Sequence, residues 1–143
     1  MAPSGIAGDR PLRAHEARRW DLPHCPQAAG LARRLSLDTL KGWGVEEDVA
    51  HQIVLAVSEL VTNAVEHALP PVALRLVPHN DHRLLHIEVA DGGPANDHGA
   101  WSASRESDER GRGSAIIDFL AAARGTHIRP GSATHWAVLP LTA

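Results

Sequence analysis

Three polar residues, Glu59, Asn63 and His67, interrupt an otherwise apolar helical pattern at intervals of four residues. Residues four apart lie one turn apart on the same face of an α-helix, so the three side chains form a single row. An asparagine in the middle of a helix is unfavourable because its amide competes for the backbone, unless it points to water or to a ligand. The row is therefore either a solvated face, which helix statistics alone favour, or part of a binding site.

Two glycine-containing segments further along the chain bear on this choice. "EVADGG" ends a predicted strand with Asp91 and two glycines, and "GRGSA" places Gly111 and Gly113 immediately before a helical pattern. The free amides at a helix N-terminus attract anions. The Rossmann motif does not fit, because its glycines follow a buried strand and "SRESDER" before Gly111 is not a strand. The Walker motif requires a Gly-Lys-Ser/Thr step that the single lysine, Lys41, does not provide. A bound phosphate would therefore contact backbone amides and arginine.

In order and spacing, the segments "ELVTNAVEH", "VADGGP", "GRGSAIID" and "ATHWAVLPL" resemble the Bergerat-fold ATP-binding superfamily, which includes gyrase and the histidine kinases. The small size is similar to the bacterial family of anti-sigma factors and serine-protein kinases typified by RsbW. The resemblance covers about residues 27–141 and departs from the family at Pro94 and Ala95, where many relatives have a further glycine. It implies an ATP-binding regulatory protein that phosphorylates an anti-sigma-factor antagonist. The alternative is a non-catalytic module of the same fold that sequesters a partner.

The resemblance also implies roles for individual residues. Asn63 would coordinate the Mg²⁺ that bridges the ATP phosphates, and Glu59 would be the general base for the attacking hydroxyl. Asp91 would accept a hydrogen bond from the adenine amino group, and Gly93 would let the base approach the backbone closely. The remaining implied nucleotide contacts are His67, Gly111, Arg112, Gly113, Ser114 and Thr134. The glycine and arginine residues would close a lid over the phosphates, and the threonine would support the adenine end.

The elements that position these residues follow from periodicity and stop signals. The sequence predicts one helix from Gln27 to "KGWG", a second from about Val45 to Leu69, and a third over "SAIIDFLAAAR". It predicts a β-hairpin over residues 72–90 and two further strands in "THIRPGSATHWAVLPL". The segment "GGPANDHGAWSASRESDERGRG" is interpreted as a mobile ATP lid or a disordered loop. This order predicts an α+β two-layer sandwich with the helices on one face of a mostly antiparallel sheet.

The length of 143 residues, with 43% hydrophobic and 22% charged residues, suits one globular domain. We expect residues 26–143 to form a histidine-kinase-like ATP-binding domain, after a flexible lead-in over residues 1–25 that shows no sustained period. A formal net charge of −3 leaves no basic field for nucleic acid. Because the chain lacks a long apolar run and a signal-peptide pattern, we expect no membrane contact and a cytoplasmic location. The single cysteine, Cys25, agrees with a reducing compartment.

Other interpretations are weaker. A sensor histidine kinase would need a phosphoacceptor helix pair, and His15 stands alone in the lead-in. A zinc site is suggested by His79, His82 and His86, but no cysteine or carboxylate completes a clear ligand set. The expected partners are a sigma factor, its antagonist, or both. A homodimer is possible, with the leucines of the first helix and Trp43 as a plausible surface.

Overall fold

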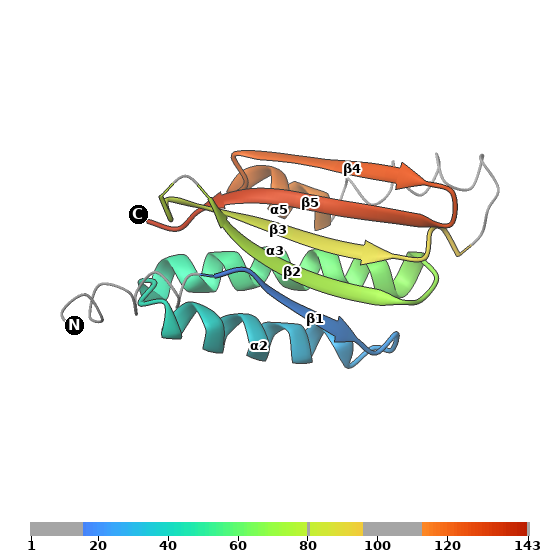
Figure 1. The fold of residues 1–143 in the computed structure, drawn as a ribbon, viewed down its shortest axis with the longest axis horizontal. Helices are drawn as coiled ribbons and strands as arrows, with labels where there is room; N and C mark the ends of the chain where they lie inside the picture. Colours follow the sequence, from blue (N-terminus) through green and yellow to red (C-terminus); the bar gives the residue numbers. More distant parts are fainter. Residues whose placement is uncertain (1–15, 80, 96–112, 143) are drawn as a thin grey trace, which may run out of the picture.

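The computed structural model describes residues 16–79, 81–95 and 113–142, without the side chains of residues 113 and 114. The elements in chain order are β1 (Arg18–Leu22), α2 (Ala28–Gly42), α3 (Glu47–His67), β2 (Val72–His79), β3 (Leu84–Asp91), α5 (Gly113–Leu120), β4 (Ala123–Arg129) and β5 (Ser132–Pro140). The strands form one antiparallel sheet in the order β1-β2-β3-β5-β4. Figure 1 shows the helices as a second layer beside this sheet, so the predicted α+β two-layer architecture is confirmed.

Helix α3 is the centre of the helical layer, in contact with α2, α5 and the three middle strands. Its apolar stripe packs on the inner face of the sheet, where Leu85, Ile87 and Val89 of β3 are fully buried. The residues between them are half-exposed, because alternate side chains of a strand point to opposite faces. The core is largely aliphatic, as the composition predicts. None of the described helices combines the length and hydropathy that a membrane crossing requires.

Strand β1 was not predicted. The sequence predicts a flexible lead-in over residues 1–25, but Arg18–Leu22 pairs with β2 along its whole length. The segment "RRWDL" is too short to display a period of its own, and its only fully apolar anchors are Trp20 and Leu22. Pairing with a neighbouring strand therefore determines its structure. Residues 1–15, which include His15, lie outside the described part of the chain.

Helix α5 ends earlier than the pattern "SAIIDFLAAAR" predicts. The helix stops at Leu120, and Ala123 already belongs to β4. The backbone N–H of Ala122 donates to the carbonyl oxygen of Val138 at 2.7 Å, which starts the pairing with β5. Tertiary pairing thus overrides the helix propensity of three consecutive alanines.

The structure divides the dimer surface that the sequence suggested. Leu40 is fully buried and Trp43 is 7% exposed, because the end of α2 packs into the core. Leu31 and Leu35 are only half-buried, so this part of α2 stays a predicted dimer surface.

Candidate functional site

The polar row of α3 lies at the margin between the core and solvent. Glu59, Asn63 and His67 are each half-buried. The His67 side chain is 19% exposed, and its Nε2 lies 3.6 Å from Oε1 of Glu66. On the other side of α3, Ile53 and its neighbours at helical spacing are buried in the core. The row is therefore neither fully solvated nor part of the apolar packing.

The C-terminal end of α3 is hydrogen-bonded to the segment that follows β3. The N–H of Leu69 donates to the carbonyl of Gly93 at 2.8 Å, and the N–H of Gly92 donates to the carbonyl of Leu69 at 2.7 Å. The N–H of Ala95 donates to the carbonyl of His67 at 3.1 Å. These three bonds hold the last turn of α3 against the end of β3. The polar row and the glycine segment thereby become parts of one site.

Asp91 is the last residue of β3, and its side chain is only 1% exposed. Its Oδ1 accepts a hydrogen bond of 2.8 Å from the N–H of Gly93. Gly93 has a φ of +94°, a conformation that favours glycine and turns its amide back to the carboxylate. The other carboxylate oxygen of Asp91, Oδ2, is buried and accepts no hydrogen bond from the described residues. Since buried polar atoms are almost always satisfied, this oxygen stands out among the described residues.

Two residues beside this carboxylate were not predicted from the sequence. His135 of β5 places its Nε2 3.3 Å from Asp91 Oδ2, and its Nδ1 lies 3.1 Å from Oγ1 of Thr126 on β4. His135 pairs with both Val89 and Thr126, so its side chain lies on the helix-facing side of the sheet. These residues come together only through the register of β3, β5 and β4, and no local sequence motif predicts their contact.

Thr134, expected at the adenine end, is not brought to Asp91. Asp91 pairs with Ala133, whereas Thr134 pairs with Ala90. Because successive strand residues point to opposite faces, the Thr134 side chain lies on the open face of the sheet, away from Asp91. The register therefore does not bring Thr134 and Asp91 together on one face of the sheet.

The glycine segment before α5 is described only in part. Gly111 and Arg112 lie outside the described residues, and so does most of the expected lid. Gly113 is the first residue of α5 and Ser114 is the second. Helix α5 packs against α3, the helix that carries the polar row.

The three histidines near the hairpin turn do not form a ligand set. Nε2 of His79 lies 3.1 Å from Nδ1 of His86, while His82 lines a separate pocket. Burial holds the pKa of His86 below its usual value, and His79 and Arg75 lower it further against the opposing effect of Glu88. Among the described residues, no group of three or more His, Cys, Asp or Glu side chains could hold a metal ion.

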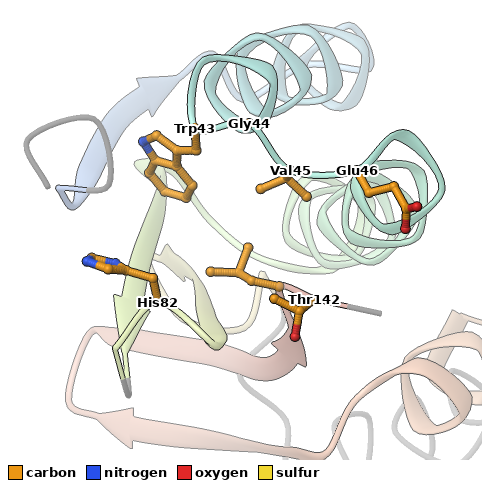
Figure 2. A pocket seen from close by; sticks show the side chains of 7 residues that line it. Trp43, Gly44, Val45, Glu46, His82 and Thr142 are labelled. Carbon is orange, nitrogen blue, oxygen red and sulfur yellow. The ribbon is translucent and has the colours of Figure 1, made fainter. Parts of the chain in front are cut away.

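A pocket of about 290 Å³ lies between the start of α3, the β2–β3 turn and the chain after β5. Figure 2 shows the rings of Trp43 and His82 along one side and Val45 on the other. Its lining residues are Trp43, Gly44, Val45, Glu46, His82, Leu141 and Thr142. The 21 residues of α3 separate it from Asp91 by about 30 Å. This pocket is therefore distinct from the candidate site.

Comparisons with known proteins agree with this fold. The family model of the histidine kinase-like ATPase domain matches residues 22–130. No relative was found among curated proteins. The crystal structure of the RsbU and RsbW domains of Rv1364c from Mycobacterium tuberculosis is similar with a TM-score of 0.67 and 21% identity. That match covers 86% of this chain, which spans only 32% of the mycobacterial chain.

A second similar structure is that of the SiaB–SiaC complex from Pseudomonas aeruginosa, with a TM-score of 0.59 and 11% identity over 98% of both chains. At these identities the two similar structures support the fold alone. The match to the family model is what shows the family of this chain. That match extends from the last residue of β1 through β4 and includes α3, Asp91 and the start of α5. The chain belongs to the family of histidine kinase-like ATPase domains.

Proposed function

We propose that this chain binds Mg²⁺ and ATP between the C-terminal half of α3, the end of β3 and the start of α5. In this proposal it transfers the γ-phosphoryl group to a hydroxyl of a partner protein. The observation that carries the proposal is the buried Asp91 carboxylate, whose Oδ2 accepts no hydrogen bond from the described residues. A buried acceptor without a donor costs about 1–3 kcal/mol. An adenine amino group would supply the missing donor.

The spacing of the polar row along α3 is consistent with the length of a nucleotide. His67 is hydrogen-bonded through its carbonyl to the segment after Asp91. Asn63 and Glu59 lie one and two turns further along the helix, at steps of about 6 Å. A nucleotide with its base at Asp91 would therefore extend its phosphates along the polar row. His67 is the residue of the row nearest to the base and is proposed to contact the nucleotide.

Asn63 fits a magnesium ligand because its half-buried side chain offers an amide oxygen beside the phosphate path. One protein oxygen is sufficient, since Mg²⁺ usually keeps several waters and binds phosphate oxygens. When bound, the ion would neutralise charge on the phosphates. Glu59, also half-buried, would orient the attacking hydroxyl and accept its proton. The segment from Gly111 through Ser114 is proposed to supply backbone amides to the phosphates.

We further propose that the accepting hydroxyl is a serine on an antagonist of an anti-sigma factor, and that the chain itself binds a sigma factor. Two similarities support a role of this kind. One similar structure contains an RsbW domain, and the other is a complex of SiaB with SiaC. The first part of the proposal to test is nucleotide binding, because phosphoryl transfer depends on it.

Calorimetric titration of ATP into the full chain, with Mg²⁺ and then with EDTA, tests the site. We expect magnesium-dependent binding that Asn63→Ala weakens at least tenfold, since the variant removes the ligand oxygen. Gln52→Ala is the matched control, because it removes an exposed amide from the same helix almost three turns away. Equal affinity of Asn63→Ala and the wild type, with or without Mg²⁺, would contradict the magnesium role. Absence of any binding by the wild type would favour the partner-sequestering alternative.

Glu59→Gln separates binding from catalysis. The glutamine keeps the size of the side chain but cannot accept a proton, so we expect unchanged ATP affinity and phosphoryl transfer reduced by about 10²-fold or more. Transfer of labelled γ-phosphate to a co-purified partner measures the second quantity. Glu47→Gln, at the exposed start of the same helix, is the control. Equal transfer by Glu59→Gln and Glu47→Gln would exclude Glu59 as the base.

A further inference from the structure

We propose that His135 is a positioning residue of the nucleotide site, which holds Asp91 Oδ2 as the acceptor for the exocyclic amino group of adenine. This inference rests on the proposed ATP site and assigns a role that the family resemblance does not include. The supporting geometry is a chain of side chains from three adjacent strands. Asp91 comes from β3, His135 from β5 and Thr126 from β4.

The two contacts of His135 favour one assignment of hydrogen to its imidazole nitrogens. A carboxylate can only accept hydrogen bonds, so the tautomer with hydrogen on Nε2 is the one that attracts Asp91 Oδ2 across 3.3 Å. Nδ1 is then the acceptor for the Thr126 hydroxyl at 3.1 Å. Thr126 thus contacts one nitrogen of the His135 ring while the other nitrogen lies near Asp91 Oδ2 without forming a hydrogen bond to it in this structure.

The two carboxylate oxygens of Asp91 have different contacts. Oδ1 is fixed by the amide of Gly93 at 2.8 Å, which sets the orientation of the carboxylate. Oδ2 faces His135 at a distance longer than a good hydrogen bond and retains lone-pair capacity for a second donor. A ligand amino group and His135 can therefore share this oxygen.

His135 also offsets the cost of the buried charge. Asp91 is 1% exposed, whereas His135 is 37% exposed and lies at the boundary with solvent. Without the imidazole, Oδ2 would lose its contact with His135, and the Gly93 amide at Oδ1 would remain as the hydrogen bond that the described residues give this carboxylate.

The test is a thermodynamic cycle between residue 135 and the amino group of the ligand. Calorimetry on the full chain compares ATP with purine riboside triphosphate, which lacks the 6-amino group. Because a hydrogen bond to a charged group is worth about 1.5–3 kcal/mol, we expect wild type to prefer ATP by about ten- to hundredfold. His135→Leu should abolish most of that preference by weakening ATP alone. His135→Gln, whose amide can still donate, should restore part of it.

His127→Leu is the matched control. It makes the same chemical change beside Thr126 but on the opposite face of the sheet, where residue 127 pairs with Thr134. It should leave the preference for ATP unchanged. Circular dichroism shows whether His135→Leu folds. If it does not, His135→Gln and Thr126→Val are compared instead. Thr126→Val should then reduce the preference for ATP over purine riboside triphosphate several-fold.

The outcomes separate this inference from the proposed function. If the wild type binds neither nucleotide, the ATP site itself is wrong, and the inference fails with it. If the wild type prefers ATP and His135→Leu keeps that preference, the ATP site stands and the positioning role is overturned. An equal loss of affinity for both nucleotides would indicate a merely structural role. Tighter ATP binding by His135→Leu would show that the imidazole competes with the ligand, which also overturns the inference.

Discussion

Three residues with polar side chains are buried among the described residues, and they are explained in different ways. Thr39 donates from Oγ1 to the carbonyl of Leu35 at 2.8 Å, so its hydroxyl is satisfied within α2. Asp91 retains an open acceptor at the candidate site, where a ligand can satisfy it. Ser36 is fully buried in α2, and its Oγ has no hydrogen-bond partner among the described residues. The same kind of unsatisfied atom thus has a functional explanation at Asp91 and none at Ser36.

Removing the Ser36 hydroxyl should therefore stabilise the protein. Ser36→Ala deletes a buried polar atom and raises helix propensity, so we expect the free energy of unfolding to rise by about 1 kcal/mol. Thr39→Ala is the control on the same helix and should lower it, because that hydroxyl is hydrogen-bonded. Urea unfolding followed by circular dichroism measures both. A loss of stability in Ser36→Ala as large as that in Thr39→Ala would show that its hydroxyl is satisfied.

At the scale of elements, the site depends on how the end of α3 meets the end of β3. The backbone passes so closely there that a Cβ at Gly92 would lie 2.2 Å from the carbonyl oxygen of Pro70 and 2.9 Å from that of Leu69. Both atoms belong to the backbone and cannot rotate away. Gly92 is therefore required by a close approach, whereas Gly93 is required by its positive φ.

Gly92→Ala tests this junction. We expect a loss of about 2–4 kcal/mol in the free energy of unfolding, because the methyl group forces the ends of α3 and β3 apart. Gly42→Ala at the end of α2 is the matched control, since a Cβ there meets nothing within 4 Å. That variant should be neutral or slightly stabilising, because alanine is the better helix former. Equal unfolding midpoints for the two variants would show that the junction can relax.

Most elements could be predicted from sequence because their signals are local. The apolar periodicity of α2 and α3 and the alternation of β3 and β5 are visible in short windows. Strand β1 and the end of α5 were not predicted correctly, because long-range pairing determines them. The same reason explains why His135 was not predicted, whereas Thr134 was expected from the family resemblance. A difference of one residue in strand position changes the face on which a side chain lies, and only the register with Asp91 reveals that face.

At the scale of the whole molecule, the sheet has one face covered by helices and one open face. On the open face a chain of polar contacts crosses β2 and β3. Arg75 donates to Oε1 of Glu88 at 3.2 Å, Oε2 of Glu88 lies 3.6 Å from His86, and His86 contacts His79. The ring of Trp136 meets His86 edge-on at 5.4 Å between centroids. These neighbours partly bury an imidazole on the exposed side of the molecule.

This arrangement makes the stability of the molecule depend on pH. Burial holds the pKa of His86 below its usual 6.5 in the folded state, and His79 and Arg75 lower it further although Glu88 opposes them. The unfolded chain, in which His86 recovers its usual pKa, therefore binds more protons below about pH 6.5. The contribution of His86 to stability is fully present above that pH and is lost as the pH falls through the folded-state pKa.

Replacing His86 by a group that does not titrate should remove this contribution. We expect the urea midpoint of His86→Gln to fall less than that of the wild type between pH 7.5 and about pH 5, with the difference opening below about pH 6.5. His127→Gln, at an exposed position on β4, is the control and should follow the wild-type curve. The comparison between curves matters, because the carboxylates and other histidines titrate in all three proteins. A His86→Gln curve parallel to the wild type would show that the neighbours compensate the burial of the imidazole fully. A His86→Gln curve steeper than the wild type would show that the pKa of His86 is raised in the folded state and not lowered.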